Sequence, residues 1–190
     1  MNQSKIATKP RSNSAFKRIM SIHWIMFYCY IILFIGGTFM ARLPNEVFGI
    51  NSLYNFHKTM GVLTMGLLIW RILTMLQVWW NKYSKRLPKF SKQWTQKVIL
   101  HTILYLFMCA VPISGFFLSN SYKSNNVHFL WITLPDIFPE DSTLVELGRS
   151  LHFWLAYTFG AFIILHAIDQ RKFIQGLWRR MLKQTSLKLD

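Results

Sequence analysis

The sequence has few acidic residues and few cysteines, and each shortage excludes a class of protein. Seven Asp and Glu stand against 22 Lys and Arg, which gives a formal net charge of +15. Two cysteines in 190 residues cannot build the framework of a disulfide-stabilised secreted domain. Charged residues make up 15% of the chain and hydrophobic residues 52%. A chain this apolar is not intrinsically disordered, because disorder requires few hydrophobic residues.

The hydrophobic residues are gathered in four blocks, each close to the ~20 residues that a helix needs to cross a bilayer. The blocks cover residues 19–41, 57–80, 98–118 and 150–168. A membrane span must pair its backbone groups internally, and these long, uniform blocks are unlike the alternating strands of a barrel. The sequence therefore predicts an all-α integral membrane four-helix bundle. A nucleic-acid partner would fit the net charge but not these apolar blocks, so none is expected.

The basic residues lie mainly in three segments: the N-terminal arm, the loop between the second and third blocks, and the C-terminal tail. Four crossings place these segments on one side of the membrane, and the positive-inside rule then predicts that both termini are cytoplasmic. Lipid headgroups are the expected partner of this charge. We predict a flexible basic arm at residues 1–14, a membrane domain at residues 15–172, and a basic interfacial tail at residues 173–190.

Five of the six histidines lie in or at the ends of the predicted spans. The predicted orientation places His57 and His152 at the outer level of the membrane. It places His23 and His166 at the inner level. His152 and His166 are fourteen residues apart, which corresponds to ~21 Å along a helix and to side chains within ~40° of one another. A single intramembrane histidine is often only a packing residue, but two imidazoles at each of two levels are suited to bis-His ligation of two haems.

Other ligand chemistries fit this pattern less well. Zinc would need three or four ligands at one level, commonly with cysteine or carboxylate, and neither lies near these levels inside the spans. The sequence has no C-x-x-C-H motif, so a haem would be bound non-covalently, as b-type haem. These observations favour two non-covalent haems over a metal-ion cluster.

Two further polar residues lie at the inner level. Arg71 follows His57 by fourteen residues, and a haem propionate would satisfy its charge. The alternative is that Arg71 extends toward the lipid headgroups. His101, at the inner end of the third block, is a third imidazole for two inner ligand positions. It is expected to contact a propionate or a quinone, or to face the headgroups.

With these residues in place, the chain resembles the bacterial cytochrome b561 family of four-helix dihaem membrane proteins. The similarity covers roughly residues 15–172, and the matching segments are Ser21–Trp24, Asn55–Gly61, Leu68–Arg71, His101, Val111–Gly115, Leu151–His152 and Leu165–His166. The resemblance implies that His23 and His166 ligate the inner haem. It implies that His57 and His152 ligate the outer haem, and that His101 is not an axial ligand.

The resemblance also implies a function in the bacterial inner membrane. The protein would carry electrons between a membrane quinone and a small periplasmic donor or acceptor, and superoxide is one donor associated with the family. As an enzyme it would then be a superoxide:quinone oxidoreductase. One alternative is a cytochrome b subunit of a membrane-bound dehydrogenase or hydrogenase. A second alternative is a four-span binding or assembly protein whose histidines only pack.

Overall fold

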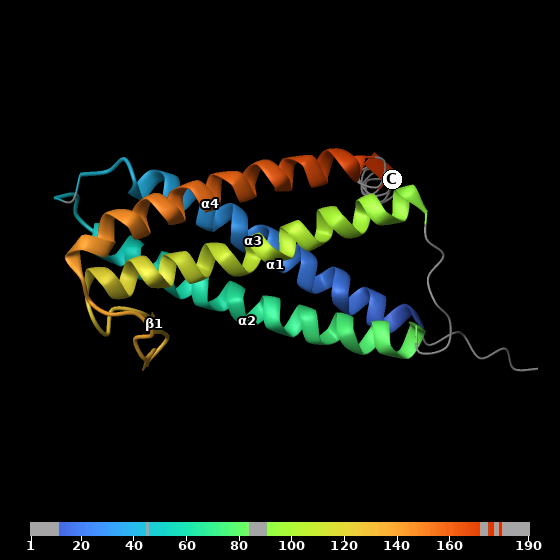
Figure 1. Ribbon diagram of the computed structural model, residues 1–190, viewed down its shortest axis with the longest axis horizontal. Helices are drawn as coiled ribbons and strands as arrows, with labels where there is room; N and C mark the ends of the chain where they lie inside the picture. The colour runs from blue at the N-terminus through green and yellow to red at the C-terminus, as the bar shows by residue number, and fades with distance from the viewer. Residues whose placement is uncertain (1–11, 45, 84–90, 172–174, 177–178, 180–190) are drawn as a thin grey trace, which may run out of the picture. The chain divides into compact units, whose positions relative to one another are not determined.

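The computed structural model of the chain describes residues 12–44, 46–83, 91–171, 175–176 and 179. Its helices are α1 (Ser12–Met40), α2 (Ile50–Tyr83), α3 (Lys92–Tyr122) and α4 (Ser142–Asp169). A short hairpin of β1 (His128–Phe129) and β2 (Ile132–Thr133) lies between α3 and α4 in the sequence (Figure 1). All four helices are long and apolar enough to cross a membrane. The predicted all-α, four-helix membrane fold is therefore confirmed.

Helices α3 and α4 begin before their hydrophobic blocks, and a polar residue caps each N-terminus. Ser91 accepts a hydrogen bond from the Trp94 backbone N–H at 3.2 Å and starts α3. Asp141 accepts one from the Thr143 N–H at 2.8 Å and starts α4. Such side chains satisfy N–H groups that the first helical turn leaves unpaired. The starts of α3 and α4 are thus set by caps, whereas the membrane spans are set by hydrophobicity.

The predicted terminal segments fall largely outside the described residues. Helix α1 begins at Ser12, so the last three residues of the predicted arm are helical, and residues 1–11 are outside the description. Of the predicted tail, only residues 175–176 and 179 are described, and all three are helical. The flexible arm and the interfacial tail therefore stay predictions.

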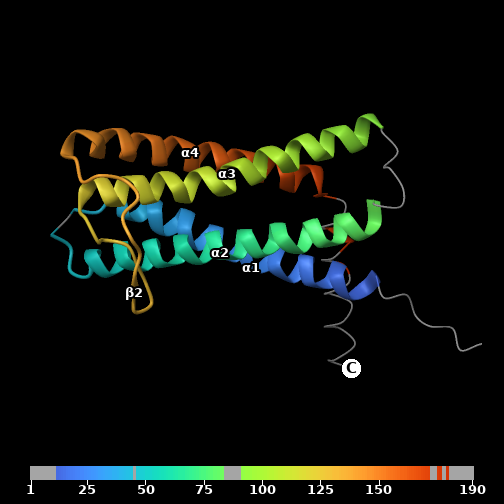
Figure 2. The same ribbon diagram turned by 60° about the horizontal axis from the view of Figure 1, so that its bottom comes forward.

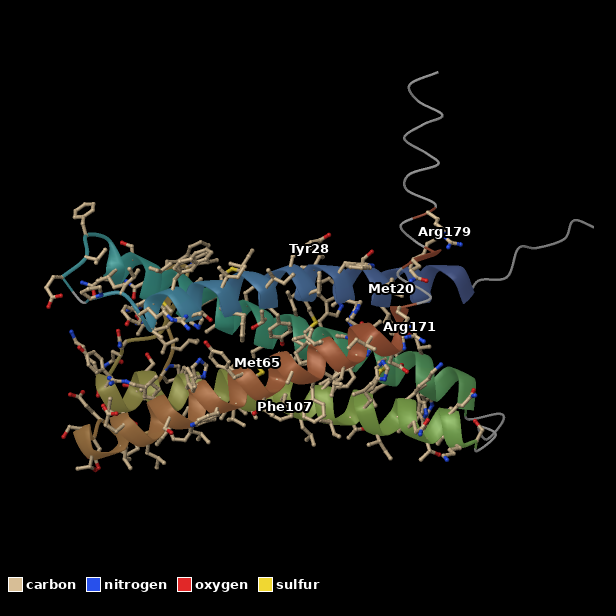
Figure 3. The ribbon with its side chains drawn as sticks, turned by 90° about the horizontal axis from the view of Figure 1, so that it is seen from above. Met20, Tyr28, Met65, Phe107, Arg171 and Arg179 are labelled. Carbon is tan, nitrogen blue, oxygen red and sulfur yellow. The ribbon has the colours of Figure 1, made fainter. Side chains whose placement is uncertain are left out.

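The chain divides into two compact units. The first contains α1, α2 and residues 128–132, and the second contains α3, α4 and the remainder of the segment between them. In each unit the two helices lie side by side and run in opposite directions (Figures 1 and 2). Phe107 of α3 illustrates the packing of the second unit, since its ring lies 6.2 Å from Phe159 and 5.4 Å from Phe162 of α4 (Figure 3).

Many large apolar side chains point away from the protein, as expected where lipid is the solvent. Tyr28 on α1 is 60% exposed and projects from the edge of its helix (Figure 3). Two buried threonine hydroxyls inside the spans are instead satisfied within their own helix. The hydroxyl of Thr64 donates to the Gly61 carbonyl at 2.8 Å, and that of Thr74 donates to the Trp70 carbonyl at 2.9 Å. These bonds to preceding turns remove the cost of an unpaired hydroxyl in the apolar interior.

The segment between α3 and α4 is organised around Asn120, which is fully buried at the end of α3. Its amide nitrogen donates to Asp136 Oδ1 at 2.7 Å, and its amide oxygen accepts from the backbone N–H of Ile137 at 3.2 Å. The second Asp136 oxygen accepts from the Asn125 N–H at 2.7 Å. Glu140 accepts from the backbone N–H of Ser124, also at 2.7 Å. These bonds close the segment into a defined loop.

Candidate functional site

His152 on α4 is held by two groups of α3 in the same unit. Its Nδ1 atom lies 3.0 Å from the Val111 carbonyl oxygen and 3.1 Å from the Ser114 hydroxyl oxygen. Because a carbonyl oxygen only accepts hydrogen bonds, the contact with Val111 requires the proton to be on Nδ1. Nε2 then carries the lone pair with which a neutral imidazole ligates a metal. Metal-binding histidines are commonly oriented by such a bond through their other ring nitrogen.

Two imidazoles lie against a glycine of the neighbouring helix. A Cβ atom placed on Gly115 of α3 would lie 3.0 Å from Cε1 of His152. In the first unit, a Cβ on Gly37 of α1 would lie 3.1 Å from Cε1 of His57 on α2. Both distances are shorter than ordinary carbon–carbon contacts of ~3.5–4.0 Å. Each glycine therefore makes room for the histidine ring, and any larger residue would push that ring aside.

A second level of polar residues lies fourteen residues along α3 and α4 from the contact between Gly115 and His152. His101 precedes Gly115 by fourteen residues, and His166 follows His152 by fourteen. Because α3 and α4 are antiparallel, these steps bring His101 and His166 together. Their ring centroids are 5.0 Å apart at an interplanar angle of 86°. His101 is also fixed through its Nδ1 atom, which lies 2.7 Å from the Lys97 carbonyl oxygen.

The first unit repeats these intervals. His23 precedes Gly37 by fourteen residues, and Arg71 follows His57 by fourteen. Since His57 faces Gly37 and the helices are antiparallel, equal steps of ~21 Å along each helix put Arg71 at the level of His23. Arg71 is half-buried there, and the His23 ring lies 5.9 Å from the ring of Trp24 on its own helix. Each unit thus carries predicted site residues at two levels.

The structure brings some of the predicted site residues together and leaves others untested. His101 and His166 are in ring contact within the second unit. The predicted ligand pairs, His23 with His166 and His57 with His152, each combine one residue from each unit, and they stay predictions. The sequence alone assigns no role to Gly37, Val111, Ser114 or Gly115. Val111, Ser114 and Gly115 lie in the segment Val111–Gly115, which resembles the cytochrome family. That resemblance could have identified them.

The donor set present here fits haem. No group of three or more His, Cys, Asp or Glu that could hold a metal ion occurs among the described residues. A tetrahedral zinc site would need such a group. His152 instead presents one imidazole nitrogen with the other fixed on a carbonyl, which is what an axial ligand of haem iron requires. The glycines opposite His57 and His152 leave room for the two rings beside the neighbouring helix.

Comparison with known proteins identifies the family. A family model described as prokaryotic cytochrome b561 matches residues 17–183. The chain is also 25% identical over 150 residues to cytochrome b561 homolog 2 of Escherichia coli (strain K12), and the match covers 77% of each protein. The chain therefore belongs to the prokaryotic cytochrome b561 family, and it is a multi-pass protein of the bacterial inner membrane that binds b-type haem and transfers electrons.

Proposed function

We propose that this protein carries electrons across the inner membrane between a membrane quinone and a small periplasmic redox partner, with superoxide as a candidate donor. The observation that carries the proposal is the recurrence of one interval. His23–Gly37, His57–Arg71, His101–Gly115 and His152–His166 are each separated by fourteen residues, one pair on each helix. That interval gives each helix two functional levels separated by ~21 Å, which suits two redox centres within a ~30 Å hydrocarbon core.

Four histidines would hold two b-type haems, His57 with His152 at one level and His23 with His166 at the other. The contact between His152 Nδ1 and the Val111 carbonyl supports this assignment, because it presents Nε2 for ligation. The glycine opposite His57 supports it too, since it leaves room for the imidazole ring beside α1. Arg71 would bind a propionate, and His101 would contact a propionate or the quinone.

When bound, each haem supplies a one-electron iron couple whose potential depends on its axial ligands and surroundings. The chain's own residues set those surroundings. The Val111 carbonyl would make the His152 imidazole a stronger donor to a bound iron, and this would favour the oxidised state. Apolar side chains of the spans exclude water and stabilise the state of lower charge. The protein would thus adjust the reduction potential of the haem at each level through different residues.

The charge distribution supports an orientation with both termini in the cytoplasm. The level of His57 and His152 would then be the periplasmic one. The level of His23 and His166 would face the cytoplasmic side. An electron donor in the periplasm would accordingly be oxidised near His57 and His152, whereas reversed flow would begin at the other level.

Haem stoichiometry of the purified protein tests the proposal. We expect two haems per chain, and His57→Ala and His152→Ala should each lose the same haem. His23→Ala and His166→Ala should each lose the other. His128→Ala is the matched control, because His128 is exposed on β1 and both haems should remain. A single haem in the wild-type protein, or loss of a haem in His101→Ala with His23→Ala silent, would overturn the ligand assignment.

The alternative is a cytochrome b subunit that works only when bound to a dehydrogenase or hydrogenase. Reduction of a soluble quinone analogue by the purified protein, with superoxide as the donor, separates the two functions. Activity of the isolated chain supports the proposed carrier. Two intact haems with no quinone reduction from any small periplasmic donor would favour the subunit role.

A further inference from the structure

The hairpin formed by β1 and β2 has an apolar tip that is exposed. Leu130 and Trp131 form its two-residue turn, and Ile132 begins the second strand. These three side chains are 65%, 86% and 54% exposed. Leu130 also has a φ angle of +55°, a left-handed conformation that two-residue hairpin turns normally give to Gly, Asn or Asp. The hairpin therefore keeps a bulky apolar residue where its own turn would favour a glycine.

The hairpin is attached to α2 at a defined depth. The Thr59 hydroxyl donates to the backbone carbonyl of His128 on β1 at 3.1 Å, and both residues belong to the first unit. Thr59 directly follows Lys58, and the stretch from Thr59 to Trp80 is close to the ~20 residues that cross the hydrocarbon core. Thr59 thus marks the edge of that core, and β1 lies at the level of the lipid headgroups.

The hairpin also lies on the side of α2 that faces lipid. Phe56, Leu63 and Trp70 follow one another at intervals of seven residues and are 50%, 36% and 54% exposed. Thr59 lies on this stripe, between Phe56 and Leu63 at helical spacing. Both ribbon views show the hairpin beside α2, with its tip to the side of the helix rather than beyond its end (Figures 1 and 2). The apolar tip continues the lipid-facing stripe of α2 into the headgroup region.

We propose that residues 130–132 insert into the headgroup–acyl boundary of the bilayer, with Trp131 as an interfacial anchor. Membrane lipid is the occupant because the tip adjoins the lipid-facing stripe of α2 at the depth where tryptophan is most favourable. There the indole ring buries its apolar surface while its N–H reaches water or a headgroup. The anchor fixes β1 at the membrane surface next to Thr59 of α2.

A nitroxide spin label at position 131 tests the depth. The variant Trp131→Cys is made in a Cys29→Ala, Cys109→Ala background and reconstituted, with haem, in phosphatidylethanolamine–phosphatidylglycerol vesicles. We expect accessibility to oxygen, which partitions into lipid, to be several-fold higher relative to a water-soluble nickel chelate than at Lys123→Cys. Lys123 is the matched control because it is exposed just after α3, outside the spans. Leu130→Cys provides a second position with the same expected result.

Two outcomes would overturn the proposal. Equal nickel-chelate accessibility at positions 131 and 123 would mean that the tip lies in water. Spectral broadening at position 131 that disappears on dilution with unlabelled protein would mean that the tip contacts a second copy of the chain. The haem spectrum and haem content of each labelled variant verify folding separately, so failure of the ligand assignment and failure of the anchor are distinguishable.

Discussion

The Nδ1 atom of His152 lies 3.0 Å from the carbonyl oxygen of Val111, and this contact joins α4 to α3. Ser114 completes the arrangement, since its hydroxyl oxygen lies 2.8 Å from the same carbonyl and 3.1 Å from Nδ1. Together the two α3 residues fix the rotation of the imidazole and its tautomer. A ring fixed in this way needs little reordering to ligate iron, and that predicts which substitutions will matter.

We expect Ser114→Ala to weaken the haem bound through His152 without abolishing it. Loss of a supporting hydrogen bond around a metal ligand typically costs about 10–100-fold in affinity. The Val111 carbonyl still orients Nδ1, so the expected loss is at the lower end, about 10-fold. The rate at which the purified variant loses haem to an excess of apomyoglobin measures the effect, and the second haem should be retained at the wild-type rate.

Ser119→Ala is the matched control for this substitution. Ser119 lies on the same helix and is 8% exposed, but its hydroxyl has no hydrogen-bond partner among the described residues. Removing it should leave both haem-loss rates unchanged. If Ser119→Ala and Ser114→Ala lost haem equally fast, the effect would come from general loosening of α3 rather than from orientation of His152.

The glycines opposite the histidines give a second prediction. In Gly37→Ala the new Cβ would lie 3.1 Å from His57 Cε1, so the ring must move by a few tenths of an ångström. We expect up to ~10-fold weaker binding of the haem that His57 ligates, because a displaced ring misaligns its ligating nitrogen. Haem transfer and the reduction potentials of the two haems measure this change. Only the haem held by His57 should be affected.

Gly36→Ala serves as the control for Gly37→Ala. A Cβ at Gly36 has no neighbouring atom within 4 Å, and the residue is adjacent in the same helix. Alanine should raise helix stability slightly there, by up to ~1 kcal/mol, and leave haem binding unchanged. Equal haem loss in both variants would show that His57 does not depend on its packing against Gly37.

The sequence predicts the spans and their histidine levels because both depend on regular spacing along single helices. The fourteen-residue interval from His152 to His166 is visible without any structure. What the sequence does not reveal is which residue of a neighbouring helix faces each histidine. That requires the register of the helix pair, which brings Gly115 and His152 together across 37 positions of sequence. Glycine and serine are common in membrane helices, so their composition alone does not identify the facing position.

The hairpin was also beyond sequence prediction. The sequence from Val127 to Leu134 is compatible with either a strand or an apolar loop. The residue at the turn is Leu130 rather than the glycine that usually marks a hairpin. Its position follows from a tertiary hydrogen bond, between Thr59 and the His128 carbonyl, across 69 positions of sequence. Local propensity carries no information about such a contact.

Asn120→Ala tests whether the loop between α3 and α4 depends on one buried side chain. The substitution removes a hydrogen bond to the Asp136 carboxylate and an acceptor for the backbone N–H groups of Ile137 and Phe138. Leaving such groups unpaired costs about 1–3 kcal/mol. We expect faster hydrogen exchange at residues 124–140 and a lower thermal midpoint. Lys123→Ala, an exposed change three residues away, should leave both unchanged, and equal effects would deny Asn120 this role.

Acidification should loosen the same loop through two carboxylates outside the spans. Hydrogen bonds from Ser124 lower the pKa of Glu140, and hydrogen bonds from the Thr143 hydroxyl and backbone N–H lower the pKa of Asp141. A carboxyl whose pKa is lower in the folded state contributes stability above its unfolded pKa of about 4, and this is lost as pH falls through the folded value. The loop should therefore be fully ordered at neutral pH and exchange faster in acid.

Hydrogen exchange at residues 124–143, corrected for the intrinsic pH dependence, measures this loosening between pH of about 6 and about 3. In the double variant Glu140→Gln, Asp141→Asn, neither position titrates, although asparagine still supplies the oxygen that caps α4. Its acid sensitivity should be clearly smaller than that of the wild-type protein. An identical acid response in both proteins would assign the loosening to another group, and Asp136, which joins Asn120 to Asn125, would be the next carboxylate to replace.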